Sequence, residues 1–214
     1  MSRTAHDPGA QRRIGLTGGI ASGKSSVGRY LTEQGVPVFD ADRYAHDALA
    51  PGSEASETVL ERYGTQVMAN PRPDTDTTPA HRSINRRALG EIVFNNPSER
   101  HWLEQLVHPL VRERFQQDFN EHDQADAVVL MIPLLFEAGL TELCSEIWVV
   151  NCTPEQQLER LQRRDGLDDA SARARINAQW PLSQKCKLAD LVLDNCGEAG
   201  RWQTQILEQM PRIG

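Results

Sequence analysis

The feature that most constrains this chain is a glycine-rich run of eight residues near its start. Residues 18–25 read Gly-Gly-Ile-Ala-Ser-Gly-Lys-Ser and satisfy the pattern G-x-x-x-x-G-K-[ST] at every fixed position. A short apolar segment, 13–17, precedes the run, and residues 23–34 after it carry apolar side chains at helical spacing. A loop of this composition between a strand and a helix is typical of a phosphate-binding loop. The chain is therefore expected to begin with the strand–loop–helix unit of an α/β fold.

Each part of the motif has its own physical role. The glycines allow backbone conformations that bring N–H groups close to phosphate oxygens. The helix that starts near Gly23 points the positive end of its dipole at the same phosphates. Lys24 can reach the β- and γ-phosphate oxygens, and the Ser25 hydroxyl can coordinate Mg²⁺. The motif predicts a site for a nucleoside triphosphate with Mg²⁺. Its predicted binding residues are Gly18, Gly19, Ile20, Ala21, Ser22, Gly23, Lys24, Ser25 and Ser26.

The apolar pattern predicts a parallel sheet around this loop. A strand at 13–17, a helix at 23–34 and a second strand at 36–39 form a βαβ unit, which implies parallel pairing. Strand patterns return after the middle of the chain, and the last segment is helical. These further predicted elements are strands at 127–132, 146–150 and 191–193 and a helix at 202–210.

The middle of the chain has helical rather than strand periodicity. Pro109 is expected to break or kink the longest of these helices, because it lacks an N–H group and crowds the preceding turn. Residues 70–83 have no apolar periodicity and are expected to form a mobile loop. The predicted helices are 44–49, 57–63, 85–94 and about 98–120. The predicted organisation is a disordered leader (1–12), a nucleotide-binding core (13–42 and 123–214) and a helical insertion (43–122).

Composition excludes several classes of protein. The 214 residues carry 23 basic and 30 acidic side chains, for a net charge of -7, so a general nucleic-acid surface is not expected. The longest apolar run, 127–136, is too short to span a membrane, and no apolar secretory signal is present. Four cysteines without a CxxC pair indicate reduced thiols. A cytoplasmic protein without membrane contact is therefore expected.

The triphosphate motif leaves open whether the chain is a switch, a motor or a kinase. A GTPase would need an Asn-Lys-x-Asp guanine reader, and no Asn-Lys pair occurs. A motor ATPase usually has an acid at the end of an apolar strand, whereas 127–132 runs directly into Pro133. Acids instead follow the second predicted strand, at Asp40 and Asp42. This position suits a carboxylate that accepts a proton from a small-molecule phosphoryl acceptor. A helix cap and a solvent-exposed acid are the alternative.

Arginines gather in the last third of the chain. Arg160 and Arg164 are four residues apart on one predicted helix and so share a face. Guanidinium groups bind phosphate oxygens and stabilise transferring charge, so the segment of about 154–187 is expected to be a lid over the triphosphate. A solvated basic helix is the alternative. His108 in the helical insertion is either an acceptor contact or a structural histidine.

Further motifs continue in a fixed order along 13–200. They are Phe39-Asp40-Ala41-Asp42, Arg87-Ala88-Leu89, Val93-Phe94-Asn95, Val107-His108-Pro109-Leu110, Pro133-Leu134-Leu135-Phe136-Glu137, Arg160-Leu161 with Arg164, Ala178-Gln179 with Lys185, Ala189-Asp190, and Asp194-Asn195 with Gly197. With the phosphate loop, this set resembles the dephospho-CoA kinase family. The resemblance departs at Ser26, where many members have Thr, and at 70–83, which is longer than usual.

The resemblance implies transfer of the ATP γ-phosphate to the ribose 3′-hydroxyl of dephospho-CoA, which gives coenzyme A and ADP in the last step of coenzyme A biosynthesis. It also implies an adenylate-kinase-like α/β fold with a five-stranded parallel sheet, helices on both faces, a helical acceptor-binding insertion and a lid. ATP, with Mg²⁺, and dephospho-CoA are the expected partners. The oligomeric state is left open, with a monomer favoured.

The resemblance also assigns roles to residues. Asp42 is the expected base, with Asp40 second, and Lys24 and Arg164 complete the catalytic set. Arg160, Arg164, Asn195 and Gly197 are expected at the ATP site, the last two near the adenine. His108, Leu134 and Glu137 are expected to line the acceptor site with Asp42. A kinase for another small acceptor and a non-catalytic nucleotide-binding module are the competing functions.

Overall fold

The computed structural model describes residues 11–69, 83–197 and 200–210. The chain divides into two compact units, Met1–Ala41 with Phe119–Gly214, and Asp42–Asp118. The first unit contains the sheet and the second is helical.

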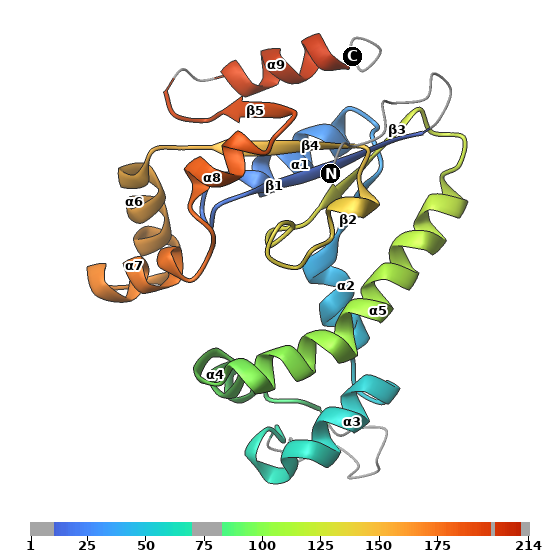
Figure 1. The fold of residues 1–214 in the computed structure, drawn as a ribbon, viewed down its shortest axis with the longest axis vertical. Helices are drawn as coiled ribbons and strands as arrows, with labels where there is room; N and C mark the ends of the chain where they lie inside the picture. Colours follow the sequence, from blue (N-terminus) through green and yellow to red (C-terminus); the bar gives the residue numbers. More distant parts are fainter. Residues whose placement is uncertain (1–10, 70–82, 198–199, 211–214) are drawn as a thin grey trace. The chain divides into compact units, whose positions relative to one another are not determined.

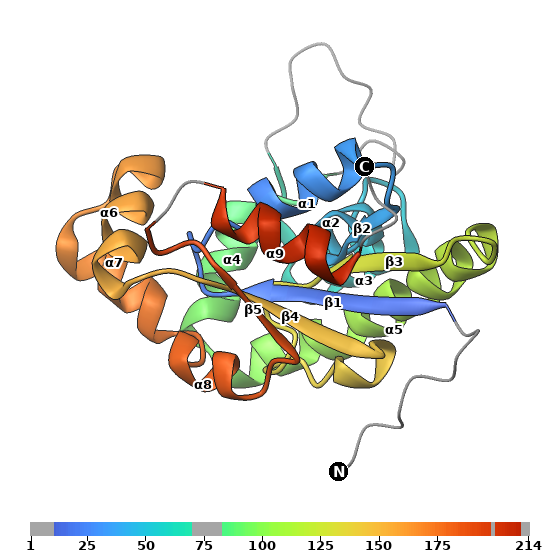
Figure 2. The ribbon, with the colours of Figure 1, turned by 90° about the horizontal axis from the view of Figure 1, so that it is seen from above.

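The first unit is built on a five-stranded parallel sheet in the order β2-β3-β1-β4-β5 (Figure 1). Its strands are β1 (Arg12–Gly18), β2 (Val38–Asp40), β3 (Ala127–Met131), β4 (Glu146–Asn151) and β5 (Leu191–Asp194). Helices α1 (Lys24–Glu33) and α9 (Arg201–Gln209) cover one face, and α8 (Leu182–Lys187) lies on the other (Figure 2). The α/β fold with a five-stranded parallel sheet and helices on both faces is confirmed.

The core of this unit follows from the alternation of side chains along β1. Ile14 and Leu16 point to the α1 face and pack with Val27 and Leu31 of that helix, and all four are at most 1% exposed. Trp148 of β4 is completely buried in the same cluster. Because helices cover both faces, the runs 127–130 of β3 and 147–150 of β4 are apolar and buried on both sides, as buried parallel strands usually are.

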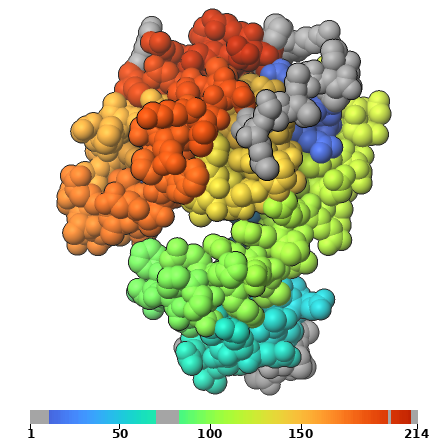
Figure 3. Space-filling model, viewed as in Figure 1, coloured from blue at the N-terminus to red at the C-terminus, as the bar shows by residue number. Residues whose placement is uncertain are grey.

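The basic segment after β4 forms a pair of short helices. Helix α6 (Pro154–Asp165) begins with a capping box in which Thr153 and Gln156 satisfy each other's backbone N–H groups. It ends at Gly166, whose φ of 66° is the left-handed conformation that glycine adopts readily. Helix α7 (Asp169–Asn177) follows and packs against α6, and the two form one continuous orange surface in Figure 3.

The described part of the second unit is mainly helical. Its helices are α2 (Ala41–Ala48), α3 (Glu54–Tyr63), the 3₁₀ helix η1 (Gly64–Gln66), α4 (Arg86–Asn95) and α5 (Pro97–Glu121). The side chains of Ser53 and Asn85 cap α3 and α4 by accepting from backbone N–H groups. Helix α5 continues through Pro109 and is bent along its length (Figure 1), so this proline does not end the helix.

Several predicted boundaries need correction. Strand β1 begins at Arg12, which the sequence placed in the leader, because Arg12 pairs with Ala127 and its Nε lies 2.7 Å from Glu146 Oε1. Strand β2 is displaced to Val38–Asp40, since the Val36 N–H group still bonds to the end of α1. A short 3₁₀ helix, η3 (Thr141–Leu143), precedes β4.

The predicted mobile loop lies, apart from Ser83, outside the described residues, as do residues 1–10 of the predicted leader. On either side of the loop, Met68 and Ile84 form an isolated antiparallel bridge. Within the described ranges, no helix has the length and apolar character needed to cross a membrane.

Candidate functional site

The parallel sheet gathers the predicted site residues of the first unit at one edge. Because all five strands run the same way, their carboxyl ends lie together, which is where open α/β sheets bind ligands. The phosphate loop (18–25) follows β1, Asp40 ends β2, residues 133–137 follow β3, and Asn195 follows β5. The strand order places Asp40 and loop 133–137 on one side of the phosphate loop and Asn195 on the other.

Two glycines of the phosphate loop are required by its packing. Gly23 has a φ of 108°, and a Cβ there would collide with the Asn195 amide. A Cβ at Gly18 would lie 2.7 Å from the Val150 carbonyl oxygen, a backbone atom that cannot easily move aside. The loop therefore has space for a backbone but not for side chains at these points, which leaves its main chain close to its surroundings.

Two cations converge on the phosphate loop. Lys24 Nζ donates to the carbonyl oxygens of Gly19 at 3.0 Å and Gly18 at 3.4 Å. Burial raises the pKa of the Cys152 thiol, and the charges of Arg160 and Lys24 act in the opposite direction. Both cations therefore lie near the carboxyl end of β4, where positive charge favours a polyphosphate ligand.

Arg160 and Asn195 are joined to this loop by hydrogen bonds. Arg160 Nη2 donates to the Asn195 carbonyl oxygen at 3.3 Å, and Asn195 Nδ2 donates to the Ser22 carbonyl oxygen at 2.8 Å. Arg160 Nη1 is buried, and no described residue accepts a hydrogen bond from it. A buried guanidinium N–H beside a phosphate loop suits an anionic oxygen. Arg164 instead pairs with Asp165, its Nε at 2.7 Å from Oδ1.

Two glutamines hold the phosphate loop at Ile20. Gln179 Oε1 accepts from the Ile20 N–H group at 2.9 Å, and Gln157 Nε2 donates to the Ile20 carbonyl oxygen at 2.8 Å. The sequence analysis missed Gln157. A signal was available, because Gln157 and Leu161 are four residues apart on α6 and both are buried, so a polar side chain lies on the apolar face of that helix.

Loop 133–137 is held by a buried ion pair. Lys185 is completely buried, and its Nζ lies 2.7 Å from Glu137 Oε1 and 3.3 Å from the Pro133 carbonyl oxygen. The Trp180 N–H group donates to the same carboxylate oxygen at 3.0 Å. Thr17 Oγ1 of β1 donates to the Pro133 carbonyl oxygen at 3.1 Å, which ties the loop to the strand that carries the phosphate motif.

The sequence that forms these two loops matches a known protein family. Residues 12–200 match the family described as Dephospho-CoA kinase. The chain belongs to the dephospho-CoA kinase family.

Relatives in this family cover nearly the whole chain. The dephospho-CoA kinase of Synechococcus sp. strain CC9605 is 59% identical over 202 residues, which are 94% of this chain and 93% of that protein. The dephospho-CoA kinase of Prochlorococcus marinus strain MIT 9313 is 53% identical over 203 residues, with 92% and 95% coverage.

Two solved structures superpose on nearly the whole chain. TT1252 from Thermus thermophilus superposes with a TM-score of 0.78 at 32% identity, covering 96% of this chain and 99% of that one. Dephospho-CoA kinase from Campylobacter jejuni superposes with a TM-score of 0.66 at 26% identity, covering 94% and 96%.

The second unit holds the remaining predicted residues of this dephospho-CoA kinase family member. Asp42 is exposed in the first turn of α2, and His108 is half-buried in α5. Asp40 belongs to the first unit, so the two candidate bases lie in different units. Leu134 is exposed on loop 133–137. A Cβ on Gly197 would meet no atom within 4 Å, so this position is open.

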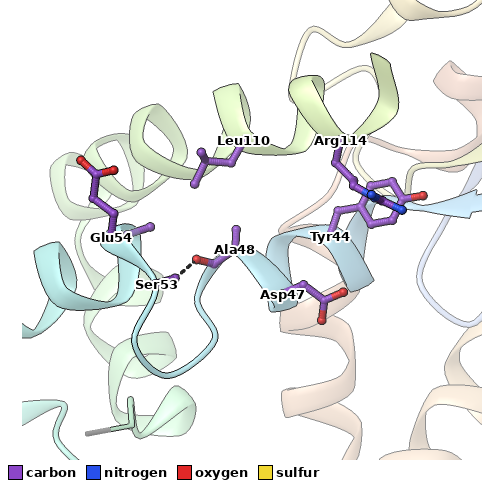
Figure 4. Close-up of a pocket in the computed structure, with 8 residues that line it drawn as sticks. Tyr44, Asp47, Ala48, Ser53, Glu54, Leu110 and Arg114 are labelled. Atoms are coloured by element: carbon purple, nitrogen blue, oxygen red, sulfur yellow. Dashed lines mark hydrogen bonds between the residues drawn. The ribbon is translucent and has the colours of Figure 1, made fainter. Parts of the chain in front are cut away.

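A pocket of about 270 Å³ lies within the helical unit of this family member, between α2, the start of α3 and α5 (Figure 4). Tyr44 and Ala48 of α2 line it on one side, and Leu110 and Arg114 of α5 line it on the other. The Tyr44 hydroxyl donates to Asp118, and burial, reinforced by that carboxylate, raises the tyrosine pKa well above its ordinary value. Arg114 Nη2 lies 3.0 Å from Asp118 Oδ1, so Asp118 contacts two of the residues that line the pocket.

The oxygen donors at the sheet edge suit Mg²⁺. In the described ranges, no group of three or more His, Cys, Asp or Glu side chains could hold a metal ion by itself. The Ser25 hydroxyl is exposed at the start of α1, beside the loop. Mg²⁺ commonly takes one or two protein oxygens and completes its shell with substrate phosphates and water. The residues present therefore fit a metal that arrives with a triphosphate.

Proposed function

We propose that this chain transfers the γ-phosphate of ATP to the ribose 3′-hydroxyl of dephospho-CoA and releases coenzyme A and ADP. The observation that carries the proposal is the pairing of a complete phosphate loop with loop 133–137 at one sheet edge, in a chain that belongs to the dephospho-CoA kinase family. This reaction is the last step of coenzyme A synthesis.

The donor site is proposed to use main-chain N–H groups of residues 18–26 together with Lys24 and Arg160. Positive charge at the carboxyl end of β4 supports this, since both cations act on Cys152 there. Asn195 and Gly197, across the phosphate loop from Asp40, are proposed to lie near the ATP adenine. Mg²⁺ is proposed to bind at Ser25, where it would neutralise phosphate charge.

Phosphoryl transfer to the acceptor requires a base that takes the hydroxyl proton and a cation that stabilises the transferring phosphate. As the 3′-oxygen bonds to the γ-phosphorus, the bond to the ADP oxygen breaks and the hydroxyl proton leaves to a carboxylate. Asp42 is proposed as that base, with Asp40 as the second candidate. Arg164 is proposed to turn from Asp165 toward the transferring phosphate when the 154–187 segment closes. His108, Leu134 and Glu137 are proposed to line the acceptor site.

The cysteines bear on the compartment in which the chain is proposed to act. Cys144, Cys152, Cys186 and Cys196 are free thiols, which supports a reducing compartment such as the cytoplasm. ATP and dephospho-CoA are the proposed partners, and a monomer is the proposed state.

An acceptor panel tests the activity. The full chain is incubated with γ-labelled ATP, Mg²⁺ and either dephospho-CoA, a nucleoside or a nucleoside monophosphate, and label transfer is measured. Dephospho-CoA should be the best acceptor. Faster transfer to a nucleoside monophosphate would identify a different small-molecule kinase. Nucleotide binding without any acceptor-stimulated ADP release would identify a binding module.

Two matched variants test the base. Asp42→Asn should lower kcat roughly 100-fold, because the amide accepts no proton. Asp40→Asn should have the smaller effect. Near-normal turnover of Asp42→Asn with a large loss in Asp40→Asn would transfer the role to Asp40.

A further inference from the structure

Two aromatic rings beside the phosphate loop have no role in the reaction as described so far. The rings of Phe136 and Trp180 are parallel within 5°, with centroids 6.1 Å apart, which is an offset stack. Trp180 is 39% exposed. A large indole that is supported by a ring on one side and open to solvent elsewhere presents an apolar surface to a flat ligand.

The stack is fixed in place from both of its ends. The backbone N–H group of Trp180 donates to Glu137 Oε1 at 3.0 Å, and Glu137 directly follows Phe136 in the chain. The same carboxylate is held by the completely buried Lys185 at 2.7 Å. The backbone beneath both rings is therefore positioned before any ligand arrives, which lowers the entropic cost of binding there.

The stack also lies close to the phosphate loop. Gln179, the residue before Trp180, accepts from the Ile20 N–H group of the phosphate loop at 2.9 Å. Phe136 belongs to the loop after β3, and β3 lies between β1 and β2 in the sheet. The rings are thus on the Asp40 side of the phosphate loop, opposite the loop of Asn195 that is proposed for the donor adenine.

The covalent structure of dephospho-CoA indicates which group would bind to these rings. In dephospho-CoA the hydroxyl that is phosphorylated belongs to the ribose that carries the adenine, so this base must lie within one sugar of the γ-phosphate. We propose that the Trp180 indole, supported by Phe136, is the stacking surface for the acceptor adenine. This inference rests on the proposed function, and it adds a base-recognition site to it.

Kinetics separate the acceptor base from the donor base. Trp180→Ala should raise the KM for dephospho-CoA about tenfold, the effect of losing one base–aromatic stack. The KM for ATP should stay within about twofold, and Trp180→Phe should recover most of the loss. Trp202→Phe is the matched control, because Trp202 packs edge-on against Tyr30 on the α1 side of the sheet.

Fluorescence gives a readout that needs no turnover. Dephospho-CoA should quench the tryptophan emission of the wild-type and Trp202→Phe chains but not that of Trp180→Phe, because a stacked purine quenches an indole. 4′-Phosphopantetheine, which lacks the adenosine, should leave all three unquenched.

Several results would overturn the inference. They are an unchanged KM for dephospho-CoA in Trp180→Ala, a rise in the KM for ATP alone, or equal quenching in Trp180→Phe and the wild type. The proposed function fails separately, if the wild-type chain transfers no phosphate to dephospho-CoA.

Discussion

The phosphate loop and loop 133–137 lie next to each other at the sheet edge. The first contains Lys24 and the second contacts Lys185, but the surroundings of the two lysines differ. Lys24 is half-buried, and its Nζ donates to two carbonyl oxygens at 3.0 and 3.4 Å. Lys185 is completely buried, and a carboxylate lies 2.7 Å from its Nζ. We propose that the first charge serves a bound triphosphate, whereas the second has a carboxylate partner inside the protein. A lysine in a sequence motif can therefore serve either chemistry or folding.

The largest effect should come from removing the ligand-facing charge. Lys24→Ala should lower kcat/KM for ATP at least about 100-fold, because the charge that stabilises the transferring phosphate is lost. The unfolding midpoint in urea should stay close to the wild-type value. Lys187→Ala on the exposed face of α8 is the matched control and should keep full activity. Retained activity in Lys24→Ala would remove the lysine from the chemistry.

The buried pair should show the opposite pattern. Lys185→Met leaves the Glu137 carboxylate without its cation and should lower the free energy of unfolding by about 3 kcal/mol. The double variant Lys185→Met with Glu137→Gln removes the uncompensated charge and should regain part of that loss. Urea denaturation at pH 7 measures both, with Lys187→Met as the control. A loss below about 1 kcal/mol for Lys185→Met would show that this pair does not hold the loop.

Gln179 connects the two loops and should give an intermediate effect. Gln179→Ala leaves the Ile20 N–H group without the acceptor it has at 2.9 Å. Loss of one such hydrogen bond is worth about 1 kcal/mol, so the KM for ATP should rise about fivefold. Gln184→Ala, on the exposed side of α8, should leave this KM unchanged. A change in kcat alone would indicate that Gln179 acts on the acceptor side.

The two loops also differ in how far sequence can describe them. The phosphate loop is specified by eight adjacent residues. Asn195 bonds to this loop and Arg160 bonds to Asn195, while the roles of both at an ATP site stay predictions. The five parallel strands were also predicted from short apolar runs, the fifth from a weaker one at 191–193. Loop 133–137 depends on Trp180, 43 residues from Glu137, and on Lys185, 52 residues from Pro133. No local pattern reports such pairings.

The ends of helices and strands were harder to predict, because they too depend on residues that are distant in the sequence. Arg12 joins β1 because of Ala127 and Glu146, which lie far along the chain. Pro109 was expected to break or kink its helix, and α5 continues through it. The roles of Asp42, His108 and Arg164 stay predictions, since no described contact tests them.

A half-buried carboxylate in the helical unit, Glu99, sharpens the comparison with Glu137. Glu99 accepts from Arg62 Nε at 2.8 Å and from the Tyr63 hydroxyl at 2.5 Å, and these bonds lower its pKa to about 2. Because the folded-state pKa is lowered, the stabilisation is complete above the ordinary pKa of 4.5 and is lost as the pH falls through about 2. Glu99→Gln should therefore lower the urea midpoint at pH 7 by less than Lys185→Met does, since Arg62 is 40% exposed and solvent screens its pair with Glu99, whereas Lys185 is completely buried. The difference between Glu99→Gln and the wild type should shrink steadily between pH 5 and pH 2. A difference that is independent of pH over that range would mean that the charge of Glu99 does not stabilise the fold.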